Sequence, residues 1–397
     1  MRADAALADR NAAVRQAARS WQEAGAIGEA TLTAIETTVP DDRVRVGPVF
    51  RGLLFLFTVL AANALFGFLW LLFFDDAEDP GLGVAAIVYG FALAGLTEFQ
   101  IGRLKRSQGG MEAAMSLVAL GYLIGGLGWF ALEIFQRSDE IAITWVLTAA
   151  AVLFAAAAWR WGYPLYAGGA AAALLLAVAR FPGGRLFWIV LPLLAMPVLL
   201  RLADSERLPP AHRHSCNAVL IVALIGLYVA VHLGSFESGL VEEIQGIPRF
   251  SRPASTSDLL WWLSVAGTAL VPVTLLAIAV RTRRYPFLIV GVGTAVASLV
   301  TLRYYVHLAP LWVVLTVSGI ALVAVVFALR RYLDSGPDRE RRGFTAEPLF
   351  EDLARQRLLE IGAAVTSLAP EARTVPDEPR FKGGGGEFGG GGSTTEF

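Results

Sequence analysis

A series of about ten apolar runs, most of them 18 residues or longer, constrains this chain more than any other feature. A helix rises about 1.5 Å per residue, so such a run crosses the roughly 30 Å of hydrocarbon in a membrane. Helices pair their own backbone amides, as hydrocarbon requires. We therefore predict an all-α fold, a polytopic transmembrane helix bundle. The predicted spans are about 48–74, 81–101, 111–135, 140–159, 163–180, 186–203, 215–234, 258–280, 285–303 and 309–329.

Composition supports the same fold class. Of the 397 residues, 55% are hydrophobic and 17% are charged, whereas a soluble domain carries about a quarter charged residues. The one cysteine, Cys216, excludes a disulfide framework within the chain and a thiolate metal cluster. The first 47 residues are charged and helical in pattern, unlike a cleavable signal peptide, so the first span is expected to be an uncleaved insertion signal.

The basic residues of the loops alternate along the chain and predict the topology. Cytoplasmic loops of membrane proteins are enriched in Lys and Arg. The loops assigned inside carry Arg103, Lys105 and Arg106, then Arg160, then Arg201, Arg207 and Arg213, then Arg281, Arg283 and Arg284. Those assigned outside carry the acids Asp75, Asp76, Glu78 and Asp79, and thinly spread Arg137, Arg180, Arg185, Arg249, Arg252 and Arg303. We predict a bacterial inner-membrane protein with both termini in the cytoplasm, although the loop with Arg180 and Arg185 goes against the bias.

Three segments lie outside the predicted bundle of residues 48–332. Residues 1–47 are predicted to form a cytoplasmic helical cap of two short helices, the first ending at Gly25. Residues 333–370 are predicted to contain a cytoplasmic amphipathic helix, and the Gly-rich residues 371–397 a disordered tail. In the longest outside loop, the spacing of apolar residues from 240 to 247 predicts a short amphipathic helix.

Two patterns concern the arrangement of the spans. The fifth span opens with Tyr163-Pro164 and the ninth with Tyr285-Pro286, four spans later. One interpretation is a parallel repeat of four spans; the other is that such boundaries recur by chance. In the third span, Gly121-x-x-x-Gly125, together with Gly126 and Gly128, predicts a smooth face for close contact between helices.

Few polar residues are candidates for function. An ionisable residue at mid-membrane is costly and indicates function, but the span centres contain almost none. Glu98 is the deepest acid, about one turn from Arg103. Arg303 and His307 lie near the outer ends, where solvation is cheap. Each has two interpretations, a boundary residue or part of a proton relay; Glu98, Arg303 and His307 are the candidate functional polar residues.

One cluster has the residue types of a metal site. His212, His214 and Cys216 occupy alternate positions, which share a face if the segment is extended. No second ligand cluster completes the site, so no metal or other cofactor is expected. The common motifs of metalloproteases, serine hydrolases and nucleotide-binding proteins are absent, and no feature indicates a nucleic-acid partner.

The order of parts resembles a group of uncharacterised bacterial polytopic membrane proteins in which a short soluble helical domain precedes eight to ten spans. The element that carries the resemblance is Trp21-Gln-Glu-Ala-Gly25-Ala-Ile27, followed by a second short helix and the first span. The resemblance implies this architecture. It implies no catalytic or binding residue.

Three classes of function remain open. The leading one is a non-enzymatic scaffold, sensor or partner subunit whose cytoplasmic ends bind another protein. The alternative is a secondary transporter of an apolar or zwitterionic small solute, favoured by the repeat. The third is a membrane-embedded enzyme with polar groups gathered at one face. That cluster would be Arg303, Tyr304, Tyr305 and His307 facing Glu237 or Glu242. Membrane lipid is an expected partner of all three, and the sequence leaves the oligomeric state open.

Overall fold

The structure is a computed structural model. It describes residues 3–23, 25–40, 47–73, 80–105, 109–134, 139–205, 207–245, 258–306, 311–335, 340–341 and 344–345. Contacts divide the chain into a first unit, Met1–Ala328, and a second unit, Leu329–Phe397.

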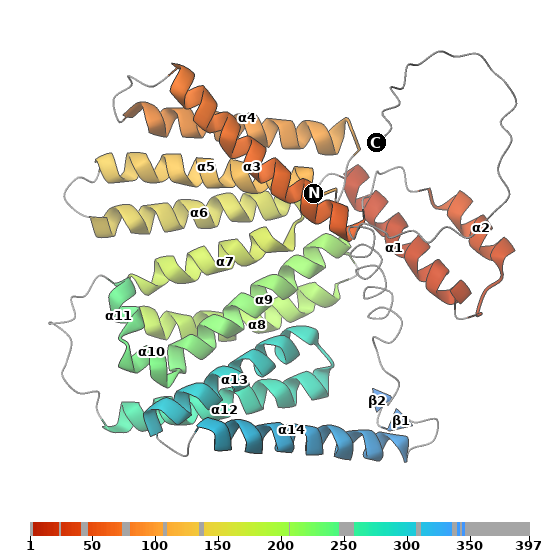
Figure 1. Ribbon diagram of the computed structural model, residues 1–397, viewed down its shortest axis with the longest axis vertical. Coiled ribbons are helices and arrows are strands. Elements are labelled where there is room, and N and C mark those ends of the chain that lie inside the picture. The colour runs from red at the N-terminus through yellow and green to blue at the C-terminus, as the bar shows by residue number, and fades with distance from the viewer. Residues whose placement is uncertain are drawn as a thin grey trace, which may run out of the picture. The chain divides into compact units, whose positions relative to one another are not determined.

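Each of the ten predicted spans coincides with a helix, and the predicted all-α bundle is confirmed (Figure 1). Among the described residues, eight helices are long and apolar enough to cross a membrane, and α7 is a shorter apolar helix of 16 residues. The ten helices are α3 (Pro48–Phe73), α4 (Pro80–Gly102), α5 (Met111–Ile134), α6 (Asp139–Trp161), α7 (Pro164–Ala179), α8 (Gly184–Asp204), α9 (Pro210–Val231), α12 (Asp258–Thr282), α13 (Tyr285–Val306) and α14 (Leu311–Asp334).

These helices expose so much apolar side-chain surface on the outside of the bundle that the arrangement would be unfavourable in water. In α3 only 6% of the most apolar window is buried within the protein. Phe50, Phe57 and Leu72 each keep at least 60% of their surface exposed. Monomeric soluble proteins rarely expose contiguous apolar patches of this kind, whereas lipid tails solvate them. The chain is a multi-pass membrane protein.

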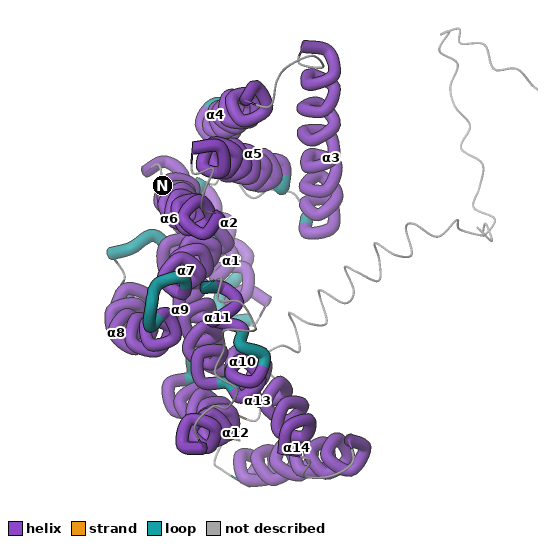
Figure 2. The backbone as a smooth tube through the Cα atoms, turned by 90° about the vertical axis from the view of Figure 1, so that its left-hand side faces the viewer, coloured by secondary structure: helices purple, strands orange, loops and turns teal. Residues whose placement is uncertain are grey.

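The spans pack mainly as neighbours in a row. Helix α4 packs on α5, α5 on α6, α6 on α7, α7 on α9, and α9 on α13. Helix α12 pairs with α13, α8 lies against α7 and α9, and α3 lies against α5. Figure 2 looks nearly along the helices and shows this order from α4 to α12. Buried clusters join the row at each step, and one unites α9, α12 and α13 through Leu220, Leu275 and Phe287.

Some contacts between helices recur at an offset of four spans. This offset relates α3 to α7, α4 to α8, α5 to α9, α6 to α12 and α7 to α13. The pairs α3–α5, α4–α5, α5–α6 and α6–α7 then correspond to α7–α9, α8–α9, α9–α12 and α12–α13, all of which are in contact.

The glycine face of α5 differs from the prediction. A Cβ added at Gly121 or Gly125 would meet nothing within 4 Å, so these two glycines face away from neighbouring helices. A Cβ added at Gly126 would lie 2.8 Å from the carbonyl oxygen of Gly83 and 2.6 Å from Ile87. Gly126, rather than the predicted pair, lets α4 and α5 approach closely, because successive glycines of a helix point in different directions.

Two helices lie within residues 1–47, the segment predicted to be the cap. Helix α1 (Ala3–Glu23) and helix α2 (Glu29–Thr38) flank Gly25, which has a positive φ of 71°. We call this pair the hairpin. Helix α1 contacts α9, and Figure 1 shows the contact near the start of α9. We call this end of the bundle the hairpin end.

Two further segments were predicted to contain helices. In the second unit, β1 (Glu340–Arg341) pairs antiparallel with β2 (Phe344–Thr345) near the start of the segment 333–370. The rest of that segment, with its predicted amphipathic helix, and the tail of residues 371–397 lie outside the described residues. In the longest loop, the helix predicted for 240–247 is α11 (Leu240–Ile244), and it is preceded by α10 (Leu233–Glu237).

Candidate functional site

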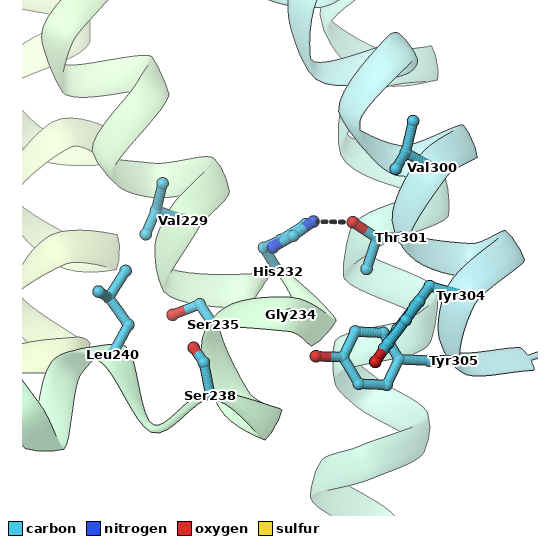
Figure 3. A pocket seen from close by; sticks show the side chains of 10 residues that line it. All are labelled: Val229, His232, Gly234, Ser235, Ser238, Leu240, Val300, Thr301, Tyr304 and Tyr305. Atoms are coloured by element: carbon cyan, nitrogen blue, oxygen red, sulfur yellow. Dashed lines mark hydrogen bonds between the residues drawn. The ribbon is translucent and has the colours of Figure 1, made fainter.

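An open pocket of about 410 Å³ lies at the end of the bundle opposite the hairpin, where α9 ends (Figure 3). We call this the pocket end. The walls come from the end of α9, from α10 and the start of α11, and from the last turns of α13. Figure 3 shows the lining residues, which are Val229, His232, Gly234, Ser235, Ser238, Leu240, Val300, Thr301, Tyr304 and Tyr305.

His232 shapes the pocket because the chain turns there from α9 into α10. Its backbone is extended, with φ −73° and ψ 131°, so α9 stops at Val231. Nε2 of His232 and Oγ1 of Thr301 share a hydrogen bond of 2.8 Å, which joins the turn to α13. The amide of Leu233 donates to Oγ1 of Thr268 in α12 at 2.8 Å. A turn that would otherwise leave buried amides unpaired is thus held from two helices.

A second set of hydrogen bonds lies nearer the bundle interior. The hydroxyls of Tyr228 in α9 and Ser298 in α13 are 2.8 Å apart, and the Ser298 hydroxyl donates to the carbonyl oxygen of Thr268 at 2.6 Å. Ser298 and Thr268 are at most 5% exposed. Because these groups are neutral and paired, they link three helices without the cost of a buried charge.

Two arginines hold the segment that covers the pocket end. Arg185, at the start of α8, donates to the carbonyl oxygens of Ala230 and Ser235, at 3.1 and 3.3 Å. Arg180 donates to the carbonyl oxygen of Ile244 at 2.6 Å. Ala230 lies in the last turn of α9 and Ile244 ends α11, and the helix dipole favours a cation at such ends. This explains two arginines in a loop where the charge bias disfavours them.

The enzyme hypothesis placed a polar cluster at this end, and the structure assembles part of it. Tyr304 and Tyr305 line the pocket, and Glu237 of α10 is within electrostatic reach of Tyr305. Arg303 is absent from the lining, and its Nε is buried without a hydrogen-bond partner. His307 lies outside the described residues, as does the side chain of Glu242.

Glu98 lies at the hairpin end and joins two helices. Its carboxylate accepts bonds from Nε and Nη2 of Arg160 at 2.7 and 2.6 Å, and from the indole of Trp161 at 2.9 Å. The expected neighbour, Arg103, makes no such bond among the described contacts. A bidentate ion pair of this kind holds α4 against α6, which is a structural role. A second ion pair at the helix ends joins Asp204, the last residue of α8, to Arg284, which lies between α12 and α13.

Glu112, a buried acid outside the candidate functional residues, also has a structural contact. Glu112 is fully buried in the first turn of α5, and its Oε1 accepts the amide of Gly109 at 2.6 Å. A carboxylate is favoured at a helix N-terminus because it pairs the free amides there. The sequence signal for this role was the position of Glu112 in the first turn of a predicted span.

The residues of the candidate metal site do not have the geometry that the site requires. Helix α9 begins at Pro210, so His212, His214 and Cys216 lie on a helix, where alternate positions point about 200° apart. The His212 ring instead stacks on Trp159, with 5.6 Å between ring centroids. Among the described residues, no group of three or more His, Cys, Asp or Glu could hold a metal ion.

The hairpin at the other end is held by charge. Arg19 pairs with Glu36 at 2.8 Å, and Arg15 lies 3.6 Å from the same carboxylate. The hydrogen bond from Arg19 lowers the pKa of Glu36 below its usual 4.5. On α1, Leu7 and Trp21 keep 61% and 52% of their surface exposed. The hairpin is thus a formed element that retains exposed apolar side chains.

No family model, curated protein or solved structure matches this chain.

Proposed function

We propose that this membrane protein works by binding, as a sensor that receives a ligand in the pocket and presents the hairpin to a protein partner. The pocket lining supports binding over catalysis. Among the described residues of the lining, His232 is the only imidazole and is bonded to Thr301, and none is a carboxylate or thiol that could complete a catalytic set.

One helix carries the sensor proposal. The outer part of α9 supplies Val229 to the pocket, His232 follows directly, and α1 contacts the same helix near its start. A rigid helix with one site at each end can couple the two sites, provided that the helix can pack against its neighbours in two arrangements. α9 packs against α7, α8, α12 and α13, so a shift of α9 would alter several contacts together.

The proposal includes an orientation. We place the hairpin in the cytoplasm and the pocket on the outer face of a bacterial inner membrane, since the basic loops favour this arrangement. Under it, a ligand would be received outside and its effect delivered inside.

The sensor proposal is tested by filling the pocket and measuring the hairpin. Val300 lines the pocket, whereas Val296, one turn earlier on α13, is similarly exposed, at 59% against 54%, and lies outside the lining. We expect Val300→Trp to change amide hydrogen exchange in residues 3–38 at least twofold in nanodiscs. Val296→Trp is the control and should leave it unchanged. Equal exchange in both variants would refute coupling between pocket and hairpin.

A secondary transporter is the second candidate, and the repeated neighbour pattern of the helices favours it. Mass spectrometry of protein purified gently from its own membrane separates the two. A stoichiometric protein partner that is lost on deleting residues 3–40 supports the sensor. A bound apolar or zwitterionic solute without a protein partner supports transport.

A further inference from the structure

We propose that the pocket binds an uncharged, hydroxyl-bearing ring of the hexose type, either as a free sugar or as the head group of a lipid. This inference names the ligand of the site on which the proposed function rests. It depends on three properties of the lining: its charge, its hydroxyls and its aromatic faces.

The described lining of the pocket carries no charge of its own. Among the described residues that line it, none is a carboxylate or a guanidinium. The nearby cations Arg180 and Arg185 already donate to the carbonyl oxygens of Ile244, Ala230 and Ser235. An anion entering the pocket would lose hydration without gaining a partner, and it would be repelled by the exposed Glu237, which is within electrostatic reach of Tyr305. A neutral ligand avoids both costs.

The polar groups of the lining are mostly hydroxyls, set in a surface that is mainly apolar. They belong to Ser235, Ser238, Thr301, Tyr304 and Tyr305; those of Thr301 and Ser235 already bond His232 and Arg185, so the tyrosine hydroxyls are the chief groups that remain for a ligand. Figure 3 shows the Tyr305 hydroxyl directed toward Ser235 and Ser238 across the pocket. A hexose carries several hydroxyls of the same double character, so it can pair with such a set from more than one side.

The remaining walls are apolar. The rings of Tyr304 and Tyr305 meet edge to face, with centroids 4.9 Å apart, and Val229, Leu240 and Val300 complete the lining. A hexose has faces of C–H groups that pack on aromatic rings while its hydroxyls point sideways. The volume of about 410 Å³ lies within the usual range of small-molecule sites, about 300–1,000 Å³.

Two sources could supply this ring. The pocket is open and lies where α9 and α13 end, so both a dissolved sugar and a glycolipid head group can reach it. The experiment therefore uses one probe of each kind. Methyl β-D-glucoside is added to nanodiscs of phosphatidylcholine and followed by saturation-transfer NMR. Monoglucosyl diacylglycerol is placed in the same nanodiscs and followed by native mass spectrometry.

The variants remove one hydroxyl at a time from the same helix. Tyr305→Phe deletes a pocket hydroxyl, and Tyr285→Phe is the matched control at the opposite end of α13. Loss of one hydrogen bond to the ring should weaken binding about fivefold. We expect this loss in Tyr305→Phe with at least one probe, near-complete loss in Val300→Trp, and no change in Tyr285→Phe.

The outcomes separate the ligand from the coupling. Binding of the lipid probe alone assigns a glycolipid, and binding of the glucoside assigns a free sugar. The inference is overturned if neither probe binds saturably. It is also overturned if the protein retains phosphatidylglycerol, an anionic lipid, as well as it retains monoglucosyl diacylglycerol. Glucosyl binding with unchanged hairpin exchange in Val300→Trp would keep the ligand and refute the sensor. Altered hairpin exchange in Val300→Trp without glucosyl binding would keep the sensor and refute the ligand.

Discussion

At the residue scale, the polar groups of this protein mostly fasten helices together. Glu98 was a candidate for function because it is the deepest acid in a predicted span. The structure gives it three donors from the end of α6, which accounts for its place without a proton relay. A charge that is paired so completely costs little to hold at a membrane boundary.

Replacing Glu98 tests this structural role. Glu98→Gln keeps the shape of the side chain and loses the charge, so we expect folding to survive with a loss of about 0.5–1.5 kcal/mol, the pair being partly exposed. Unfolding of the purified protein in mixed micelles measures it. In a double-mutant cycle, Arg160→Gln should add little once Glu98 is changed. Independent, additive effects would show that the two side chains do not act together.

Arg185 is the corresponding residue at the pocket end. Because it holds two backbone carbonyls, Arg185→Gln should free α10 and raise amide exchange in residues 233–244 several-fold. Arg281→Gln, an exposed arginine at the end of α12, serves as the control. Exchange that is equal in both variants would mean that the arginine does not hold the segment.

At the scale of elements, close packing of α4 on α5 depends on particular glycines rather than on glycine content. We expect Gly126→Ala to destabilise the bundle by about 1–3 kcal/mol, because a new Cβ would press on the backbone of α4. Gly125→Ala, the adjacent control, enters open space and should be neutral. The measurement is thermal unfolding in detergent, and equal losses in the two variants would refute the assigned contact.

The hairpin should respond to acid. Arg19 holds the pKa of Glu36 below 4.5, so its carboxylate stabilises the fold fully above that pH. This stability is lost as the pH falls through the lower, folded-state pKa. We expect proteolysis within residues 3–38 to accelerate as the pH is taken from 6 to 3 with an acid-active protease. In Glu36→Gln the hairpin should be cut faster at pH 6 and depend less on pH; an unaltered profile would contradict the pairing.

At the scale of the whole molecule, the orientation is the prediction with the widest consequences. Reporter fusions after Tyr332 should report the cytoplasm, and fusions within 235–257 should report the outside, because the basic loops favour an inside location. The reverse pattern would place the hairpin outside and overturn the direction proposed for sensing.

The spans could be predicted because a membrane crossing requires consecutive residues to be apolar, and that pattern is visible in the sequence. Each crossing needs a continuous apolar run with a self-paired backbone, and the ten runs appear as α3 to α9 and α12 to α14. The hairpin could also be predicted, since Gly25 interrupts a polar helical pattern. The pairing of Glu98 with Arg160 could not, because 62 residues separate them and nothing in either segment names its neighbour.

The sequence alone therefore determined that this chain is a helical membrane bundle with a small helical cap, for local reasons of hydropathy and helix termination. Only the tertiary structure decided which glycine brings α4 to α5, that His212 lies on a helix and stacks on Trp159, and that a pocket exists. The pocket joins residues 229–240 to residues 300–305. It forms because α9 packs beside α13, and helix packing depends on side chains that meet across long separations in the chain.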